Sequence, residues 1–262
     1  MVNADKVKRV VIKVGTSTLT HEGGRLNIRR FEKLVKVISD IRNSGIEVVL
    51  VSSGAIGVGM GKAGVSKRPE STREKQALAA IGQCELMNFY GSLFEDYSHT
   101  VAQILLTRDV TDIPLRRENA INTFETLFSL NVIPIVNEND TISTEQIEFG
   151  DNDTLSAIVA ELVNADLLVL LSDIDGLYDK DPHKFDDAEI VPEVESITDE
   201  IRALAGGTGT SRGTGGMVTK IHAAEIATIA GVDMIIANGA EPDVLYDIFD
   251  GKKVGTLFKK KN

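Results

Sequence analysis

Short runs of apolar residues alternate along this chain with segments in which apolar residues recur at every third or fourth position. Such runs are typical of strands buried on both faces of a sheet, and the periodic segments have the spacing of amphipathic helices. We expect strands at 7–14, 47–51, 101–106, 132–136, 167–171 and 233–237. The alternation predicts an α/β fold, a three-layer α/β/α sandwich with a central, mostly parallel sheet.

Two of the expected helices begin with recognisable capping residues. Asn27 precedes a helix whose apolar positions run from Ile28 to Ile41, and Gly45 marks its end. Ser71 and the glutamate three residues later form a capping-box pattern at the start of a helix over 72–96. Further helices are expected at 116–129, 152–163 and 217–230.

The composition is that of a folded, acidic protein. The chain has 262 residues, 42% of them hydrophobic, which is enough for one large domain or two small lobes with a sizeable core. The formal net charge is −11, and the basic residues cluster only at 259–261, which we interpret as a solvated end. We therefore expect no nucleic-acid partner.

The single cysteine and the lengths of the apolar runs indicate in which cellular compartment the protein lies. Cys84 excludes an internal disulfide and fits a reducing cytosol, and its helical spacing from Leu78 and Ile81 predicts a packed thiol. The opening MVNADKVKRV lacks the apolar core of a signal peptide, and no apolar stretch approaches the 18 or so residues of a membrane span. We expect a cytoplasmic protein with no membrane partner.

Glycines gather after the predicted strands, at Gly15, over 54–64 and over 206–216. In open α/β sheets ligands bind where the carboxyl ends of the strands meet, so these glycines place several candidate loops on one rim. This distribution favours a binding protein or an enzyme over a scaffold.

Three familiar site motifs are absent or incomplete. GMGKAG at 59–64 fits G-x-G-x-x-G, but it is not tight against its strand, and SKRP follows where a dinucleotide-binding fold needs a helix. The Gly-Lys pairs at 61–62 and 251–252 lack the upstream glycine and the following hydroxyl of a Walker A loop. The four histidines have no metal-ligand spacing, so no zinc site is expected.

The stretch GGTGTSRGTGGMVTK at 206–220 predicts an anion site. Its glycines and threonines run directly into a helix, where unpaired backbone N–H groups and the positive end of the helix dipole attract phosphate. Lys220 lies about one turn into that helix, so its side chain can reach the same anion. The alternative is a surface loop before an ordinary helix.

The run VVIKVGTSTL at 10–19 places Lys13 just before the end of a buried strand. At that position the lysine can emerge at the rim, and Gly15 allows a phosphate to approach the backbone. The alternative is an edge strand with Lys13 in solvent. Two lysines, each beside a glycine-rich turn, predict a clamp for the phosphates of one nucleotide.

Acids and amides follow two other strands. The run VNENDTISTEQIEFGDNDTLSA at 136–157 suits the binding of an ammonium group or the orientation of a lysine, although Asp151 or Asn152 also fits a helix cap. In LLSDIDGLYDKDP at 170–182, Ser172 and Asp173 follow a buried strand near the glycine-rich loop, where a base or ribose could be held.

Five ordered blocks carry a resemblance that spans essentially the whole chain. These blocks are IKVGTSTL, VSSGAIGVG, NENDTI, FGDNDTLSA with LLSDIDGLYDKDP, and GTGGMVTK. Together they resemble the amino acid kinase family, and SSGAIGVG with FGDNDTLSA resembles its glutamate 5-kinase branch. The resemblance implies transfer of the ATP γ-phosphate, with Mg²⁺, to the side-chain carboxylate of L-glutamate, which gives L-glutamyl 5-phosphate, the first step toward proline.

The resemblance also implies residue roles. Lys13 and Lys220 would contact the transferring phosphate, and Asp153 would hold both lysines. The residues implied in glutamate binding are Ser53, Gly54, Asn137, Asp140 and Asn152. Those implied in nucleotide binding are Lys13, Gly15, Ser172, Asp173, Thr214, Gly215, Gly216, Met217, Val218, Thr219 and Lys220.

The same resemblance implies an organisation and partners. It implies one amino acid kinase domain over 1–262, with an amino-acid lobe at about 1–164 and a nucleotide lobe at about 165–262. Many members carry a C-terminal PUA domain, which these 262 residues do not include. Further implications are a homo-oligomer, a dimer or a tetramer, proline as a feedback inhibitor, and handover of the product to glutamyl phosphate reductase.

Two other functions stay open from the sequence. One keeps the fold and phosphorylates another small acid, such as N-acetylglutamate or aspartate. The other is a nucleotide or amino-acid sensor without catalysis, which the presence of both lysines and Asp153 disfavours.

Overall fold

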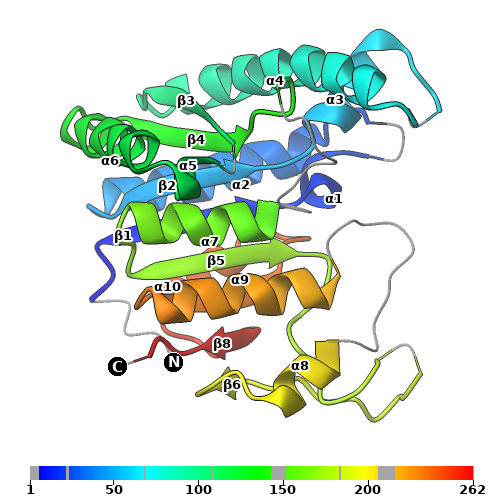
Figure 1. Ribbon diagram of the computed structural model, residues 1–262, viewed down its shortest axis with the longest axis vertical. Helices are drawn as coiled ribbons and strands as arrows, with labels where there is room; N and C mark the ends of the chain where they lie inside the picture. The colour runs from blue at the N-terminus through cyan, green and yellow to red at the C-terminus, as the bar shows by residue number, and fades with distance from the viewer. Residues whose placement is uncertain are drawn as a thin grey trace.

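The computed structural model is built around one β-sheet with helices on both of its faces (Figure 1). It describes residues 6–21, 24–67, 69–107, 109–142, 152–182, 184–205 and 216–261. In these residues the strands are β1 (Arg9–Val14), β2 (Glu47–Ser52), β3 (Val101–Leu106), β4 (Ile133–Glu138), β5 (Leu167–Ser172), β6 (Glu193–Val194), β7 (Asp233–Asn238) and β8 (Thr256–Phe258).

The helices connect most of these strands as crossovers. They are α1 (Thr16–Leu19), α2 (Ile28–Asn43), α3 (Ala55–Ala63), α4 (Thr72–Glu95), α5 (Asp109–Asp112), α6 (Pro114–Ser129), α7 (Asn152–Leu162), α8 (Asp199–Ala205), α9 (Met217–Ile229) and α10 (Val244–Phe249). In Figure 1, α7 and α9 lie in front of the sheet and α2 lies behind it. The expected three-layer α/β/α arrangement is therefore confirmed.

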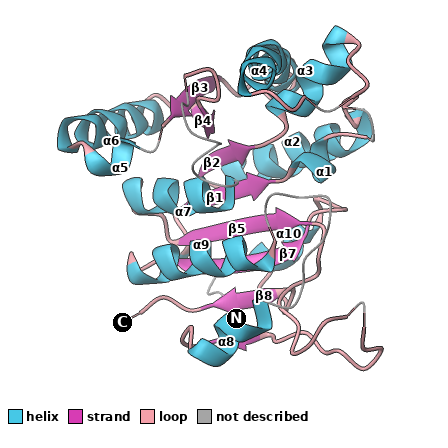
Figure 2. Cartoon of the chain, turned by 45° about the vertical axis from the view of Figure 1, so that its right-hand side comes forward, coloured by secondary structure: helices cyan, strands magenta, loops and turns pink. Residues whose placement is uncertain are grey.

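The strand order is β3-β4-β2-β1-β5-β7-β8-β6. β1 pairs in parallel with both β2 and β5, so it lies in the middle of the sheet, as the turned view in Figure 2 also shows. β8 runs antiparallel to β7, which makes the sheet mostly parallel, as predicted. The pattern missed β6 and β8 because two or three residues are too few to show a period.

Alternate residues of β1 face different halves of the core. Val10, Ile12 and Val14 pack with residues of α2 and α4, whereas Val11 packs in the other cluster, with residues of α7 and α9. Because side chains alternate along a strand, Lys13 faces the same side as Val11. The strand period therefore directs this lysine toward α7 and α9.

Both capping predictions are confirmed. The Asn27 side chain accepts a hydrogen bond from the Arg30 N–H at 3.2 Å at the start of α2. At the start of α4, Ser71 Oγ accepts from the Glu74 N–H at 3.3 Å and donates to the Glu74 carboxylate at 2.8 Å. The sequence signals thus mark where these two helices begin.

The glycine run at 54–64, which was expected to form a loop, is helical after Gly54. After Gly54 the chain forms α3, and a methyl group added at Gly59 would overlap the Leu78 carbonyl oxygen of α4. A methyl group at Gly82 of α4 would likewise overlap the Ala55 carbonyl oxygen. Gly59 and Gly82 therefore let the backbones of α3 and α4 approach closely.

The prediction that Cys84 is packed was also wrong, because this residue is exposed. The buried face of α4 carries Leu78, Gly82, Leu86 and Tyr90, at intervals of four residues. Ile81 and Cys84 lie on the opposite side of the helix, where Ile81 is exposed as well. Among the described residues, no helix is long and apolar enough to cross a membrane.

The packing of α3 on α4 predicts a large difference between two glycines of one helix. Gly82→Ala is expected to lower the free energy of unfolding by about 1–3 kcal/mol, because its methyl group has no space beside Ala55. The control is Gly91→Ala, where nothing lies within 4 Å of the added methyl group. This change is expected to raise stability by about 0.5–1 kcal/mol. Urea unfolding measures both, and equal stabilities would contradict the packing described.

Candidate active site

Two lysines and one aspartate meet between the sheet and its α7–α9 layer. Lys13 Nζ lies 2.6 Å from Asp153 Oδ1, and Lys220 Nζ lies 2.9 Å from Asp153 Oδ2. The exposed fractions are 6% for Lys13, 5% for Lys220 and 0% for Asp153. The structure therefore brings together the three residues expected to be catalytic, and each oxygen of one carboxylate contacts a different ammonium group.

Three elements place these side chains. Lys13 lies near the end of β1, opposite Val51 of β2 and Leu170 of β5, so the edge-strand alternative is wrong. Asp153 is the second residue of α7, and Lys220 lies in the first turns of α9. Since α7 and α9 cover the sheet side by side, their N-terminal ends lie near the carboxyl end of β1 (Figure 2).

The electrostatics of this cluster favour an anion. The three side chains carry a net formal charge of +1 in a chain whose net charge is −11. A buried ion pair offsets the loss of hydration of its charges only when its geometry is good and further hydrogen bonds satisfy its remaining polar atoms. The Thr219 hydroxyl lies 3.2 Å from Asp153 Oδ2 and 2.8 Å from the Gly216 carbonyl oxygen, so it joins the start of α9 to the cluster.

Two glycines border the cluster for different reasons. Gly54, between β2 and α3, has φ of 98°, a left-handed conformation that favours glycine, and it packs on the Thr16 side chain. Gly15 has an ordinary extended backbone, φ −81° and ψ 162°. A methyl group added there would lie 4.0 Å from Lys13 Nζ, so the absence of a side chain leaves space beside the ammonium group.

A chain of amides lies beside the lysine cluster. Asn152 Nδ2, which carries two N–H donors, lies within hydrogen-bonding distance of three acceptors: the Ser52 carbonyl oxygen at 2.6 Å, Ser53 Oγ at 3.0 Å and Asn137 Oδ1 at 2.8 Å. Asn137 Nδ2 in turn donates to Gln83 Oε1 at 2.9 Å. The ends of β2 and β4 and the start of α7 are thereby joined, which unites three of the residues expected to bind substrate.

Asp140 follows β4 and is the remaining acid of this group. Burial raises the pKa of its carboxyl from 3.8 to about 6, because the charged form loses hydration. A cationic group bound next to Asp140 would reverse this effect. Its position and its desolvation therefore suit an ammonium ligand.

The residues expected to bind nucleotide are only partly described. Ser172 ends β5, the strand next to β1, and its hydroxyl donates to Asp173 at 3.1 Å. Gly216 caps α9; Met217 is buried there, while Val218 is 59% exposed. Thr214 and Gly215 lie outside the described residues, as do Gly150 and Asp151 of the acid and amide segment.

Sequence reasoning missed Gln83 and the role of Tyr90. Both lie on α4; the Tyr90 hydroxyl lies 3.0 Å from Ser52 Oγ, and burial raises its pKa. The one feature of the sequence that could have indicated Gln83 is its position directly after Gly82, on the buried side of a helix. This indication is weak because the partner, Asn137, lies 54 positions away.

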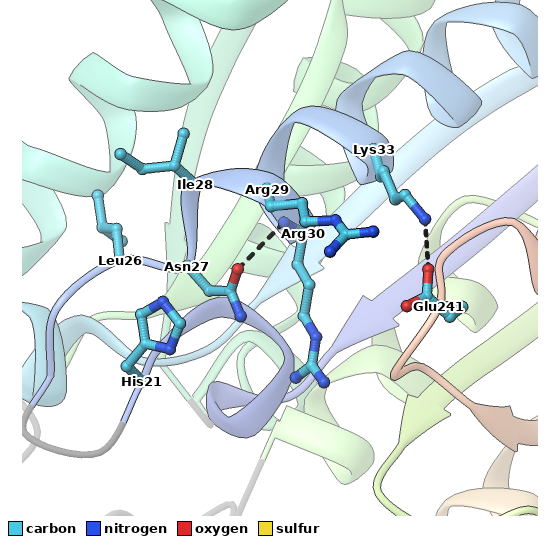
Figure 3. Close-up of a pocket in the computed structure, with 8 residues that line it drawn as sticks. All are labelled: His21, Leu26, Asn27, Ile28, Arg29, Arg30, Lys33 and Glu241. Carbon is cyan, nitrogen blue, oxygen red and sulfur yellow. Dashed lines mark hydrogen bonds and ion pairs between the residues drawn. The ribbon is translucent and has the colours of Figure 1, made fainter.

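A separate basic cavity of about 450 Å³ lies beside α1 (Figure 3). Arg29, Arg30 and Lys33 of α2 line it, and Lys33 pairs with Glu241. Arg30 also donates to the Ser17 carbonyl of α1 at 3.1 Å. This contact links α2 to the turn that follows Gly15.

A metal centre made by side chains alone does not occur in the part of the chain that the structure describes. There, no three His, Cys, Asp or Glu residues gather as metal ligands. Asp153, the carboxylate nearest the lysines, already contacts both ammonium groups. The described side chains therefore do not fit a cation site of their own.

Comparisons with known proteins agree on one family. A model described as the amino acid kinase family matches residues 8–238. The glutamate 5-kinase of Clostridium perfringens is 59% identical, covering 97% of this chain and 96% of that protein. The glutamate 5-kinase of Listeria innocua is 55% identical, covering 97% and 94%. The solved carbamate kinase from Giardia lamblia bound to AMP-PNP has a TM-score of 0.67 at 22% identity, covering 98% of this chain and 99% of its own, a likeness of fold.

The raised pKa of Asp140 predicts a more stable variant. The folded state binds more protons than the unfolded state between pH 3.8 and about 6, so stability from this group is lost as pH rises through that range. Asp140→Asn is therefore expected to raise the free energy of unfolding at pH 7 by about 1–3 kcal/mol, and to change it little at pH 3.5.

The control is Asp186→Asn, which removes an exposed carboxylate. It is expected to change stability by less than about 0.5 kcal/mol at both pH values. Denaturant titrations at the two pH values measure the difference. An Asp140→Asn variant that is no more stable than the parent at pH 7 would show that burial does not disfavour this charge.

Proposed function

The chain belongs to the amino acid kinase family, and we propose that the Lys13–Asp153–Lys220 cluster is where it transfers the γ-phosphoryl group of ATP to the side-chain carboxylate of L-glutamate. The product is L-glutamyl 5-phosphate, whose formation is the first step of proline biosynthesis. The observation that carries the proposed site is one buried carboxylate that holds two ammonium groups where β1, α7 and α9 meet.

The reaction needs little from the protein besides charge and position. A glutamate carboxylate is already ionised at pH 7, so one of its oxygens attacks the γ-phosphorus directly and ADP leaves, with no proton to remove. Two anions must approach while charge spreads over the transferring group. In the proposal Lys13 and Lys220 stabilise that charge, and Asp153 holds both ammonium groups where they meet the phosphate.

The proposed glutamate site is the end of β2 and β4 with the start of α7. Ser53, Asn137 and Asn152 are joined by hydrogen bonds there, and Gly54 gives the turn its left-handed backbone. Asp140 is proposed to bind the substrate ammonium group. The desolvation that raises the pKa of its carboxyl is then offset when the cation binds.

The proposed nucleotide site is the rim from β1 to α9. Gly15 leaves space for phosphate beside Lys13, and the first backbone N–H groups of α9, from Gly216 to Val218, favour an anion. Thr214 and Gly215 remain part of this proposal from the sequence, as do Ser172 and Asp173. Kinases use ATP with a divalent ion; Mg²⁺ is proposed to be bound by the phosphates, since the described side chains form no metal site.

Other parts of the proposal rest on the family alone. They include an amino-acid lobe at about 1–164 and a nucleotide lobe at about 165–262, and a dimeric or tetrameric assembly. They also include feedback inhibition by proline and handover of the product to glutamyl phosphate reductase. A cytoplasmic location is proposed from the sequence instead, from its single cysteine and the composition of its first residues. Each stays a prediction.

Trapping the product tests the proposed function. With ATP, Mg²⁺ and L-glutamate, hydroxylamine is expected to convert the acyl phosphate into a hydroxamate, which a phosphate ester does not give. N-acetylglutamate and aspartate serve as alternative acceptors in the same assay. ADP release without hydroxamate, hydroxamate only from another acceptor, or ATP binding with no turnover would each overturn the glutamate assignment.

The lysine pair predicts a specific loss of turnover. Lys13→Ala and Lys220→Ala are each expected to lower kcat by about 10²-fold to 10³-fold, the usual effect of removing one positioned electrostatic group. In either variant Asp153 keeps the other lysine as partner, so the fold is expected to persist. Steady-state kinetics and circular dichroism measure the two properties.

Lys36→Ala is the matched control, because it removes an exposed lysine of α2. Its kcat is expected to stay within about 2-fold of the parent, as for most exposed substitutions. Near-parental turnover in Lys13→Ala or Lys220→Ala would reject the proposed site while leaving the hydroxamate result intact.

A further inference from the structure

The amide chain next to the lysine cluster ends on Gln83, a residue for which the sequence predicted no role. We propose that Gln83 Nε2 binds the α-carboxylate of the amino-acid substrate and thereby selects an acceptor with a free α-carboxylate. This inference rests on the proposed function, because it assigns one contact within the proposed glutamate site.

The polarity of the amide chain is fixed by the backbone. The Glu138 N–H donates to Asn137 Oδ1 at 2.9 Å, so this atom is the acceptor oxygen and not the amide nitrogen. Asn152 Nδ2 donates to the same oxygen at 2.8 Å. Asn137 must therefore offer its Nδ2 on the other side, where it donates to Gln83 Oε1 at 2.9 Å.

Because Gln83 Oε1 faces Asn137, its Nε2 atom is directed away from Asn137. Since Oε1 accepts, the Nε2 group carries two N–H donors, and among the described residues it makes no hydrogen bond. A donor pair on a half-buried amide suits a carboxylate, which accepts hydrogen bonds only. Asp140, three residues after Asn137, offers the opposite character, because a carboxylate accepts hydrogen bonds from an ammonium group.

The position of Gln83 assigns it to the α end of the substrate. Asn152 is the neighbour of Asp153 in the sequence, and Gln83 lies two hydrogen bonds further along the amide chain. The side-chain carboxylate must approach the phosphate near Lys13 and Lys220. The α-carboxylate and α-ammonium groups, bonded to one carbon, are then left for Gln83 and Asp140.

The helix that carries Gln83 is held firmly against this site. The preceding residue, Gly82, packs on the Ala55 backbone directly after the Ser53–Gly54 turn. Two turns further along, Tyr90 is fully buried and contacts Ser52 at the end of β2. The backbone of Gln83 is thus fixed relative to the turn that bears Ser53, as a specificity contact requires.

Gln83→Glu separates a contact with substrate from a purely structural role. The substituted side chain keeps an acceptor for Asn137 but replaces the two donors with a second, negatively charged oxygen. We expect KM for L-glutamate to rise at least 10-fold, with kcat within about 3-fold and KM for ATP unchanged. Asn88→Asp, the same change at an exposed position of α4, is expected to leave all three values unchanged.

L-isoglutamine, in which a carboxamide replaces the α-carboxylate, gives the second readout. Gln83→Glu is expected to lower the kcat/KM ratio of glutamate to isoglutamine at least 10-fold, because the carboxylate now accepts from the amide of the substrate. Gln83→Met removes both the acceptor for Asn137 and the two N–H donors. It is expected to raise KM for glutamate without lowering the ratio of glutamate to isoglutamine as far as Gln83→Glu does.

Two results would overturn the inference. One is a parental KM for glutamate in Gln83→Glu together with a raised KM in Gln83→Met, which would show that Gln83 acts only by orienting Asn137. The other is an unchanged ratio of glutamate to isoglutamine in Gln83→Glu. Both differ from a failure of the proposed function, in which the parent protein itself forms no hydroxamate from glutamate.

Discussion

The carboxylate of Asp153, shared by two buried lysines, is the interaction on which the rest of the site depends. Each of its oxygens contacts one ammonium group, from β1 on one side and from α9 on the other. Removing one partner from a buried ion pair typically costs about 3–5 kcal/mol, because it leaves a charge without compensation. In this cluster the carboxylate has two lysine partners, so the loss of one lysine still leaves one ion pair. In the parent protein, Asp153 determines the position of both ammonium groups.

The fold extends this constraint outward through side-chain hydrogen bonds and close packing of helices. Asn152, next to Asp153 at the start of α7, connects the ends of β2 and β4 through its hydrogen bonds. Glycines then let α3 and α4 pack so closely that Gln83 joins the same chain of amides. The positive cluster and the chain of amides are therefore adjacent parts of one network, which suits a reaction that brings two anions together.

The sequence predicted features that depend on neighbouring residues, and it did not predict features that depend on contacts between distant parts of the chain. The six longer strands lie within two residues of their predicted positions, because their apolar runs are complete in themselves. Periodicity could not decide whether Lys13 was at an edge; its pairing with both β2 and β5 decides it. The glycine-rich α3 was missed because glycine disfavours helices, and only the contact with α4 makes this one stable.

The acid and amide segment was predicted from composition, but its geometry was not. That Asn137 and Asn152 share a hydrogen bond, and that Gln83 ends their chain, follows from three elements meeting in space. The exposed Cys84 is a second example, because α4 has apolar residues on two faces. The sequence pattern did not distinguish them, and in the structure the face with Leu86 and Tyr90 is the buried one.

The most direct measurement is kcat of the Lys13→Ala/Lys220→Ala double variant, compared with kcat of each single variant. Losing either lysine leaves the Asp153 carboxylate paired but held from one side only, so the remaining ammonium group is displaced and the two losses are not additive in free energy. The account predicts that the double variant turns over little more slowly than the worse single variant. A loss equal to the product of the two single losses would show that the lysines act independently, and would contradict it.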